Sequence, residues 1–223
     1  MVNQSQLTST LQNNFFAIID SNISFFRFIY MNIEFIIPTY NRVNHLITLI
    51  ASLMAQSNPN WKAHIIADCP DAATVDRIKQ MITFFNDKRI KLTVLPERCN
   101  DWGHTPRQLG VDNSTSEWVI MTGEDNYYVP EFVDLMLVEG KNQHFVYCDM
   151  VHNWTDKQYV PVKTKLNFGH IDIGCFMVKT NLAQKVRLKV TQEWADWYFV
   201  EEFMIKFKHT NIKKVNKTLY VHN

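Results

Sequence analysis

The sequence predicts an α/β fold, a single domain with a mostly parallel central sheet and helices on both faces. From residue 33 to residue 121, short apolar runs typical of buried strands alternate with segments whose apolar residues recur every three or four positions, as in helices. Because each parallel crossover needs a helix, this alternation favours a parallel sheet. The 223 residues, 46% apolar and 20% charged, are enough for one sizeable core and few for two.

The first half is predicted as four strands with helices between them. Residues 33–38 (IEFIIP) form a continuous apolar run, and the apolar residues from Val43 to Met54 have helical spacing. The other elements are predicted in the same way: a strand at 63–68, a helix at 75–85, a strand at 90–95, a loop through Trp102 and Gly103, a helix starting at Pro106 and a strand at 118–121.

After Pro130 the pattern changes, and the second half is predicted to form the edge of the sheet and the wall of the substrate site. Its expected elements are a helix from Phe132 to Gly140, a strand at 144–149, a polar loop at 154–165, a strand at 171–178, a helix from Asp196 to Phe207 and a final strand at 217–223.

Charge and cysteine usage argue against several classes of protein. A formal net charge of +1 leaves no concentrated basic face, so we expect no nucleic-acid partner. The cysteines, at 69, 99, 148 and 175, form no CxxC pair, which argues against a zinc site and fits a reducing cytosol. No GxGxxG follows the first strand, which disfavours a nicotinamide dehydrogenase.

The amino-terminal residues 1–30 differ in composition from the rest. They are rich in Asn, Gln and Ser and then in Phe, and charged residues interrupt every apolar stretch, so none reaches the roughly 18 to 20 residues of a transmembrane helix. No signal-peptide pattern is present either. We expect a cytoplasmic protein with an extension at 1–30 and one domain at 31–223. The sequence leaves three alternatives for the extension. It can be an added helix, a segment that contacts a partner or a membrane surface, or simply an upstream extension.

One segment, WVIMTGEDNYYVP at residues 118–130, carries the most chemical information. Glu124 and Asp125 follow its apolar run and precede a proline that can open a helix at the first position. Open α/β sheets bind ligands at the carboxyl ends of their strands, and hard oxygen ligands there suit Mg²⁺ or Mn²⁺ bridging a diphosphate. An isolated acidic pair is more often a polar turn, so this interpretation depends on the other motifs.

Four motifs together resemble family 2 glycosyltransferases with the GT-A (Rossmann-like) fold. They are IIPTYNR at 36–42, Asp68 after the second strand, GEDN at 123–126, and Asp196 with Trp197 at the head of a late helix. The stretches NDWGHTPRQLG, VYCDMVHN, HIDIG and ADWYFVEE are similar to one subgroup of that family. The resemblance covers residues 32–223. It implies a UDP- or GDP-linked sugar donor, a saccharide or other hydroxyl acceptor, and Mn²⁺ or Mg²⁺ as cofactor.

Residues for the nucleotide are expected at the strand ends of the first half. Tyr40 offers an aromatic face for a base and Arg42 a cation for phosphate, while Asp68 can accept a hydrogen bond from an N–H of uracil or guanine. Arg107 follows a proline at a helix start, where its guanidinium and free backbone N–H groups can face one anion. The expected set is Pro38, Thr39, Tyr40, Arg42, Asp68, Arg107 and Glu124. For each segment alone, an ordinary turn or surface residue is the alternative.

The resemblance also implies a metal site. The family motif is Asp-x-Asp, and alignment on Pro130 puts Gly123 and Asp125 on the two acids, so the first acid is absent from this chain. We expect Asp125 to bind the metal, with Glu124 as a substitute or supporting group. His222 matches a C-terminal His that often completes the metal site in this fold.

Asp196 falls on the Asp that acts as catalytic base in inverting members of the family. A carboxylate there can take the proton of the acceptor hydroxyl as its oxygen attacks the anomeric carbon. An N-cap role for the following helix is the alternative, and both can hold at once. The residues expected around the sugar or acceptor are Trp102, Asp149, His170, Asp172, Trp194 and Trp197. Packing is the alternative for the tryptophans, and strand-end capping for Asp172.

The sequence therefore predicts an inverting nucleotide-sugar glycosyltransferase, with Asp196 as the base and Asp125 and His222 on the metal. Two rivals stay open. One is a retaining transferase of the same fold. The other is a nucleotide-sugar-binding module that has lost catalysis, which the acid missing at Gly123 favours.

Overall fold

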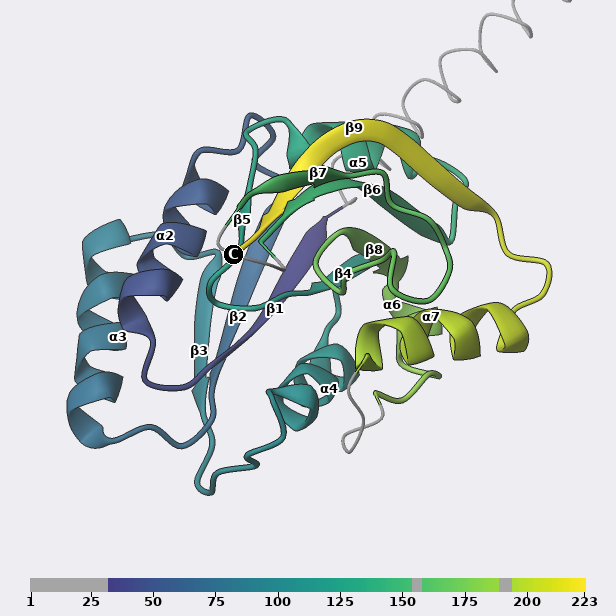
Figure 1. The fold of residues 1–223 in the computed structure, drawn as a ribbon. Helices are drawn as coiled ribbons and strands as arrows, with labels where there is room; N and C mark the ends of the chain where they lie inside the picture. Colours follow the sequence, from purple (N-terminus) through teal and green to yellow (C-terminus); the bar gives the residue numbers. More distant parts are fainter. Residues whose placement is uncertain (1–31, 154–157, 189–193) are drawn as a thin grey trace, which may run out of the picture. The chain divides into compact units, whose positions relative to one another are not determined.

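The structure, a computed structural model, describes residues 32–153, 158–188 and 194–223 (Figure 1). Residues 32–223 form one compact unit. The extension expected at 1–30 and part of the loop expected at 154–165 lie outside the described residues. No helix in the described ranges has both the length and the apolar character that crossing a bilayer requires.

The first half forms a block of four parallel strands, as predicted. The elements are β1 (Ile33–Thr39), α2 (Val43–Met54), β2 (Trp61–Ala67), α3 (Ala72–Phe85), β3 (Ile90–Val94), α4 (His104–Asn113) and β4 (Trp118–Met121). The strand order is β3-β2-β1-β4, and each of the three pairings is parallel.

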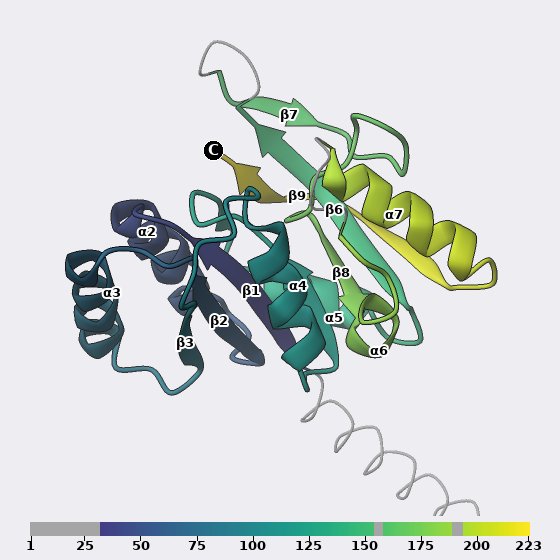
Figure 2. The same ribbon diagram turned by 90° about the horizontal axis from the view of Figure 1, so that it is seen from below.

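Both faces of this block are covered, also as predicted. The crossovers through α2 and α3 run one way across the sheet and the crossover through α4 runs back, so right-handed connections put α4 on the opposite face (Figure 2). A Cβ at Gly110 of α4 would lie 2.3 Å from Ile36, so only glycine allows this approach. The neighbouring Phe35 instead packs on Tyr128 and Phe132, with ring centroids 4.9 and 6.1 Å away. Successive side chains of a strand point to opposite faces, so β1 is buried from both sides.

The second half continues the sheet with mixed strands. Its elements are β5 (Tyr127–Tyr128), α5 (Phe132–Glu139), β6 (Phe145–His152), β7 (Val160–Val162), β8 (Phe176–Lys179), α6 (Thr180–Ala183), α7 (Ala195–Lys206) and β9 (Ile212–His222). β8 is antiparallel to β4 and to β6, β9 is parallel to β6, and β5 is antiparallel to β9. β7 pairs with β6, which gives a sheet of nine strands within the described residues.

The strand predicted at 171–178 is shorter in the structure, since β8 begins only at Phe176. A side-chain oxygen of Asp172 accepts a hydrogen bond from the Gly174 backbone N–H at 2.8 Å, which makes this segment a turn. Gly174 lies against Tyr220, and a Cβ there would be 2.5 Å from the phenol ring. The turn therefore holds a carboxylate inside the fold, where the prediction had an extended strand.

Other boundaries also differ from the prediction. α4 begins at His104 instead of Pro106, because Gly103 with φ +82° precedes it and Asp101 accepts a hydrogen bond from the Thr105 N–H at 2.8 Å. α5 begins at Phe132, as predicted, so Pro130 precedes this helix and does not open it. β9 begins at Ile212, well before residue 217.

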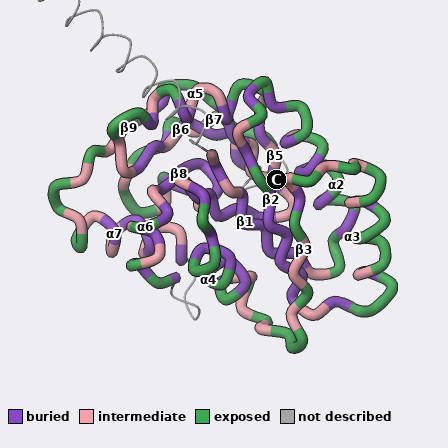
Figure 3. The backbone as a smooth tube through the Cα atoms, turned by 180° about the vertical axis from the view of Figure 1, so that it is seen from behind, coloured by how far each residue is buried: buried purple, intermediate pink, exposed green. Residues whose placement is uncertain are grey.

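Burial follows the sheet closely, with buried segments along β1, β2 and β4 and exposed ones on the outer sides of the helices (Figure 3). Trp61, Trp118 and Tyr220 are among the largest side chains that are fully buried. Some charged side chains are buried with them. A buried charge is costly unless it is paired or hydrogen-bonded, so each of these side chains needs a partner. They are Asp68, Arg107, Asp149 and Asp172.

Candidate active site

The carboxyl ends of β1, β2 and β4 lie side by side and form the edge where the nucleotide residues are predicted. Thr39 is paired with Ala67 across β1 and β2. Backbone hydrogen bonds continue past the strands: the Asp68 N–H donates to the Thr39 carbonyl at 2.9 Å, and the Thr122 N–H to the Ile36 carbonyl at 3.1 Å. The residues that follow the three strands are therefore held in place by the sheet.

Asp68 anchors the loop that follows β3. One carboxylate oxygen accepts the Cys99 N–H at 2.8 Å, and the other accepts the Asn100 N–H at 3.3 Å. The residue is buried, at 6% exposure. Each carboxylate oxygen has a second lone pair, so the group can still accept one N–H from a ligand.

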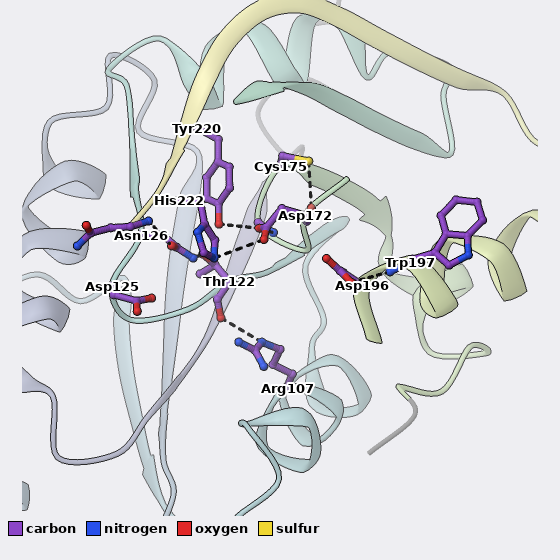
Figure 4. A network of polar contacts seen from close by, with 12 residues as sticks. Arg107, Thr122, Asp125, Asn126, Asp172, Cys175, Asp196, Trp197, Tyr220 and His222 are labelled. Atoms are coloured by element: carbon purple, nitrogen blue, oxygen red, sulfur yellow. Dashed lines mark hydrogen bonds and ion pairs between the residues drawn. The ribbon is translucent and has the colours of Figure 1, made fainter. Parts of the chain in front are cut away.

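Arg107 is buried beneath the same edge and comes from the first turn of α4. Its Nε donates to the Thr122 carbonyl at 3.1 Å (Figure 4). Its Nη1 donates to the Trp102 carbonyl at 2.9 Å. Burial lowers the pKa of this guanidinium, and the negative charges of Glu124 and Asp172 act in the opposite direction. Both hydrogen bonds go to neutral carbonyls, so the cation keeps its charge available for an anion nearby.

The segment after β1 carries the other residues predicted for the nucleotide. The guanidinium carbon of Arg98 lies 3.5 Å from the centre of the Tyr40 ring and covers one face of it. Pro38 packs on Gly103 so closely that a Cβ there would be 2.8 Å away. The hydroxyl of Thr39 is buried and has no hydrogen-bond partner within the described residues.

The acidic pair after β4 binds Arg42. An Oδ of Asp125 lies 2.9 Å from the Arg42 Nη1, and an Oε of Glu124 lies 3.8 Å from the same nitrogen. Burial raises the pKa of Glu124, with the charge of Asp125 adding to the shift. A Cβ at Gly123 would meet Asp125 at 2.9 Å and Asn126 at 3.1 Å, so the place of the missing first acid is filled by these neighbours.

His222 lies in a cluster with Asp172 and His152. Its Nε2 is 3.6 Å from an Oδ of Asp172, and its ring stacks on the His152 ring with centroids 4.0 Å apart and planes 12° from parallel. One ligand atom from each of the three residues lies within 4.8 Å of the other two. Burial and the adjacent His222 lower the pKa of His152 to about 3, so this imidazole is neutral.

His152 is absent from the predicted set, although it belongs to this cluster. The parallel pairing of β6 and β9 puts His152 directly beside His222. The sequence gives one signal, a histidine near the end of each strand. The pairing of two strands so distant in the chain could not be deduced from it.

Asp196 has the most perturbed carboxyl group of the site. It lies in the first turn of α7, where its side chain accepts the Trp197 N–H at 2.8 Å (Figure 4). Burial raises its pKa to about 6, and the negative charge of Asp172 adds to the effect. The N-cap position belongs to Trp194, so the alternative of Asp196 as the N-cap is wrong.

Two residues predicted near the substrate have other surroundings. Asp149 is buried, and its oxygens bind Lys163 at 2.9 Å, Lys214 at 2.7 Å and the Thr164 N–H at 3.0 Å. Burial alone would raise its pKa, but the two lysines hold it below the usual value. His170 is exposed in the loop before the Asp172 turn, where its backbone bonds to neighbouring loop residues. These contacts favour a structural role for Asp149.

The tryptophans predicted around the sugar differ in exposure. Trp102 is 70% exposed beside His104, with ring centroids 6.4 Å apart. Trp194 is 48% exposed and packs on Phe168 with centroids 5.0 Å apart. The indole of Trp197 extends away from the Asp196 carboxylate (Figure 4). Trp194 and Phe168 thus form an accessible aromatic surface close in sequence to Asp196 and Asp172.

A family model described as "Glycosyl transferase family 2" matches residues 34–209. The chain belongs to glycosyl transferase family 2. This match confirms the resemblance derived from the four motifs, and it includes every predicted site residue except His222.

Curated proteins described as glycosyltransferases are similar to part of the chain. An uncharacterized glycosyltransferase of Haemophilus influenzae is 26% identical over 127 residues, which are 54% of this chain and 40% of that protein. The putative colanic acid biosynthesis glycosyl transferase WcaA of Escherichia coli is 26% identical over 105 residues, 47% of this chain and 36% of the relative. The chain therefore corresponds to two fifths or less of these relatives.

Solved structures share the fold. The structure of TarS of S. aureus in complex with UDP-GlcNAc matches this chain with a TM-score of 0.71 at 16% identity. The match covers 86% of this chain and 59% of the TarS chain. The mannosyltransferase PcManGT of Pyrobaculum calidifontis, in complex with GDP-Man and Mn²⁺, has a TM-score of 0.64 at 10% identity and covers 85% and 56%. At these identities the likeness confirms the predicted GT-A fold alone.

Proposed function

We propose that this glycosyltransferase moves a sugar from a UDP- or GDP-linked donor to a hydroxyl group of a saccharide or other acceptor, with inversion and metal assistance. The observation that carries the proposal is the Asp196 carboxyl, whose pKa burial raises to about 6. A general base works best when its pKa lies near the working pH. At neutral pH this carboxylate is largely ionised and ready to accept a proton.

The nucleotide would bind at the strand ends of the first half. Asp68 offers a fixed acceptor for a base N–H, and Tyr40 offers a ring face once Arg98 moves aside. Arg107 is a buried cation beneath the place proposed for the diphosphate. Both substrate-bearing relatives, one with UDP-GlcNAc and one with GDP-Man, are consistent with this class of donor.

The residues present fit a divalent cation. Asp125 offers a carboxylate at the strand end, and the Nδ1 of His222 is buried without a hydrogen-bond partner in the described residues. Asp125 and His222 would hold Mn²⁺ or Mg²⁺. When bound, such an ion neutralises the charge that develops on the departing diphosphate.

Transfer itself would be a single displacement. The acceptor hydroxyl oxygen forms a bond to the anomeric carbon while the bond from that carbon to the diphosphate oxygen breaks. The hydroxyl proton passes to Asp196, and Arg107 supplies positive charge to the leaving group. A retaining reaction of the same fold would not need Asp196 in this role.

A binding module without turnover is the second candidate, because Gly123 replaces the first acid of the family motif. Turnover of labelled donors separates the two. We expect release of UDP or GDP from the matching nucleotide-sugar, and transfer once an acceptor is supplied. Tight donor binding without any release of nucleotide would favour the binding module.

A panel of nucleotide-sugars, screened for thermal stabilisation with and without Mn²⁺, identifies the donor first. A ligand at 100 times its Kd adds roughly 2.7 kcal/mol to the free energy of unfolding. We expect one base to stabilise the chain more than the others, and more strongly with Mn²⁺. No stabilisation by any UDP- or GDP-sugar would overturn the proposal.

We also propose that residues 31–223 are the catalytic domain and that the protein works in the cytoplasm, where the four free cysteines suit a reducing medium. The proposal includes contact of residues 1–30 with a membrane surface. A chain starting at Met31 should fold and bind the donor. If it is unfolded by circular dichroism, the proposed boundary is wrong.

A further inference from the structure

The loss of the first acid at Gly123 leaves the protein short of one oxygen ligand. The cluster of His152, Asp172 and His222 lies near the same segment, since the Asn223 N–H next to His222 donates to the Asn126 Oδ1 at 3.3 Å (Figure 4). We infer that these three side chains form the cation site of the nucleotide-free protein, and that they select Mn²⁺ over Mg²⁺. The catalytic use of this site rests on the proposed function, but the binding of the cation does not.

Three different elements bring the ligands together. His152 ends β6, His222 ends β9, and the parallel pairing of these strands puts the two histidines in register. Asp172 comes from the turn before β8 (Figure 4). Ligand atoms of all three residues lie within 4.8 Å of one another. The carboxylate and the imidazoles therefore converge without any movement of the backbone.

One carboxylate oxygen of Asp172, Oδ1, accepts hydrogen bonds from neighbouring groups, and the other, Oδ2, faces His222. Carboxylates that bind a metal are usually hydrogen-bonded in this way. The Asp172 Oδ1 accepts the Tyr220 hydroxyl at 2.7 Å and the Gly174 N–H at 2.8 Å, whereas Oδ2 is 3.6 Å from His222. These hydrogen bonds fix the orientation of the carboxylate and leave Oδ2 for an ion. Tyr220 thus acts as a positioning residue.

The stacked imidazoles must separate when an ion binds. An imidazole nitrogen binds an ion that lies in the plane of its ring. Because the two ring planes are 12° from parallel and the centroids are 4.0 Å apart, an ion in the plane of one ring lies outside the plane of the other. One ring must turn before both nitrogens can bind. The side chain of His222 is 31% exposed, whereas His152 is buried, so His222 has the room to turn.

The ligand types decide which cation is preferred. Imidazole nitrogens suit the first-row transition metals, whereas Mg²⁺ takes oxygen ligands in a strict octahedron and keeps several waters. Two imidazoles and one carboxylate therefore favour Mn²⁺. Asp125 lies outside the cluster and pairs with Arg42 at 2.9 Å, so it would join only when a donor diphosphate draws Arg42 away.

Electron paramagnetic resonance of Mn²⁺ titrated into the full chain, without nucleotide, tests the inference. We expect Mn²⁺ to bind, and a large excess of Mg²⁺ to displace it poorly. Asp172→Asn and His222→Gln each remove a ligand, so each should weaken binding by at least the roughly tenfold loss that follows from removing a group that only supports a ligand. Tyr220→Phe, which keeps the ring, should weaken binding by about the same factor.

His64→Gln serves as the control. It removes another buried histidine, one whose Nε2 is bonded to Thr93 at 2.8 Å, and should leave the Mn²⁺ affinity unchanged. Asp125→Asn removes the residue proposed to hold the ion when a donor is bound, so it distinguishes that site from the cluster. Unchanged affinity in Asp172→Asn and Tyr220→Phe would overturn the inference and leave Asp172 and His222 as neighbours that hold no cation.

Equal displacement by Mg²⁺, or a loss confined to Asp125→Asn, would overturn it as well. Because the titration contains neither donor nor acceptor, its outcome does not depend on whether the protein transfers sugar. A protein that binds Mn²⁺ through the cluster but turns over no nucleotide-sugar would support this inference and contradict the proposed function.

Discussion

The two halves of the site satisfy their polar groups in different ways. In the first half, Asp68 binds two backbone N–H groups and Arg107 binds two backbone carbonyls, so both side chains are held by the main chain. In the second half, Asp172, Asp196 and His222 gather in one region. There a carboxyl pKa is raised to about 6 and an imidazole nitrogen has no hydrogen-bond partner among the described residues.

This difference separates two tasks. Charged groups that are fixed by backbone hydrogen bonds cost little reorganisation when they bind a ligand, which suits recognition of a nucleotide. Like charges gathered in a buried place destabilise the fold and shift pKa values, which suits proton transfer. The first half should therefore lose stability when its charged groups are removed, and the second half should lose activity.

The largest effect is expected for Asp196→Asn, which removes the base and keeps the acceptor oxygen for the Trp197 N–H. A positioned general base contributes roughly 10²- to 10⁴-fold, so sugar transfer should fall by that factor. Donor affinity, which depends on the first half, should stay within a few-fold. Steady-state transfer rates and donor titrations on both proteins measure the two quantities.

Glu201→Gln is the matched control for this variant, since Glu201 lies further along the same helix. It should leave transfer nearly unchanged. Near-normal transfer in Asp196→Asn would contradict Asp196 as the base and point to Glu201 or Glu202. If donor affinity falls by the same factor as transfer, Asp196 has a structural role.

A smaller effect, on stability, is expected for Asp68→Ala. The change leaves the N–H groups of Cys99 and Asn100 without their acceptor, at a cost of about 1–3 kcal/mol in the free energy of unfolding. Donor affinity should fall as well, because the loop loses its anchor. Urea denaturation and donor titration test both effects. Undiminished stability would mean that the loop does not depend on Asp68.

Asp196→Asn, in contrast to Asp68→Ala, should raise the free energy of unfolding at neutral pH. Folding raises the pKa of Asp196 from 3.8 to about 6, so between these values the folded protein holds a proton that the unfolded chain has released. The stability that this carboxyl contributes is complete below 3.8 and is lost as the pH rises through 6. The neutral Asn variant should therefore be the more stable protein at about pH 7.5, with its advantage shrinking towards about pH 4.

Urea denaturation at the two pH values measures this difference. If Asp196→Asn is less stable than the parent protein at neutral pH, the Asp196 carboxylate stabilises α7. The proposed division between the two halves would then fail for Asp196.

The periodicity of the sequence was sufficient to predict the parallel half of the fold. Continuous apolar runs at 33–38 and 118–121 became the central strands, because only strands buried on both faces need such runs. The turn at Asp172 was missed, since a carboxylate hydrogen bond to Gly174 and the close approach of Tyr220 are tertiary contacts.

The positions of the candidate site residues were predictable where these residues belong to the parallel half of the sheet. Asp68 and Arg107 belong to the parallel half, where order along the chain fixes position at the sheet edge. Asp149 and His152 depend on β6, whose neighbours come from distant segments. Neither the two lysines that bind Asp149 nor the histidine stacked on His152 can be inferred from local sequence.

The pH dependence of transfer tests the division between the two halves most directly. We predict that kcat/KM rises with pH through about 6 and then levels, because Asp196 must be ionised to act, with Asp172 and His222 as the ionisable groups that influence it. The donor dissociation constant, measured in the same buffers, should stay constant over this range. A rate that does not change through this range, or a donor affinity that carries the whole change, would contradict the account.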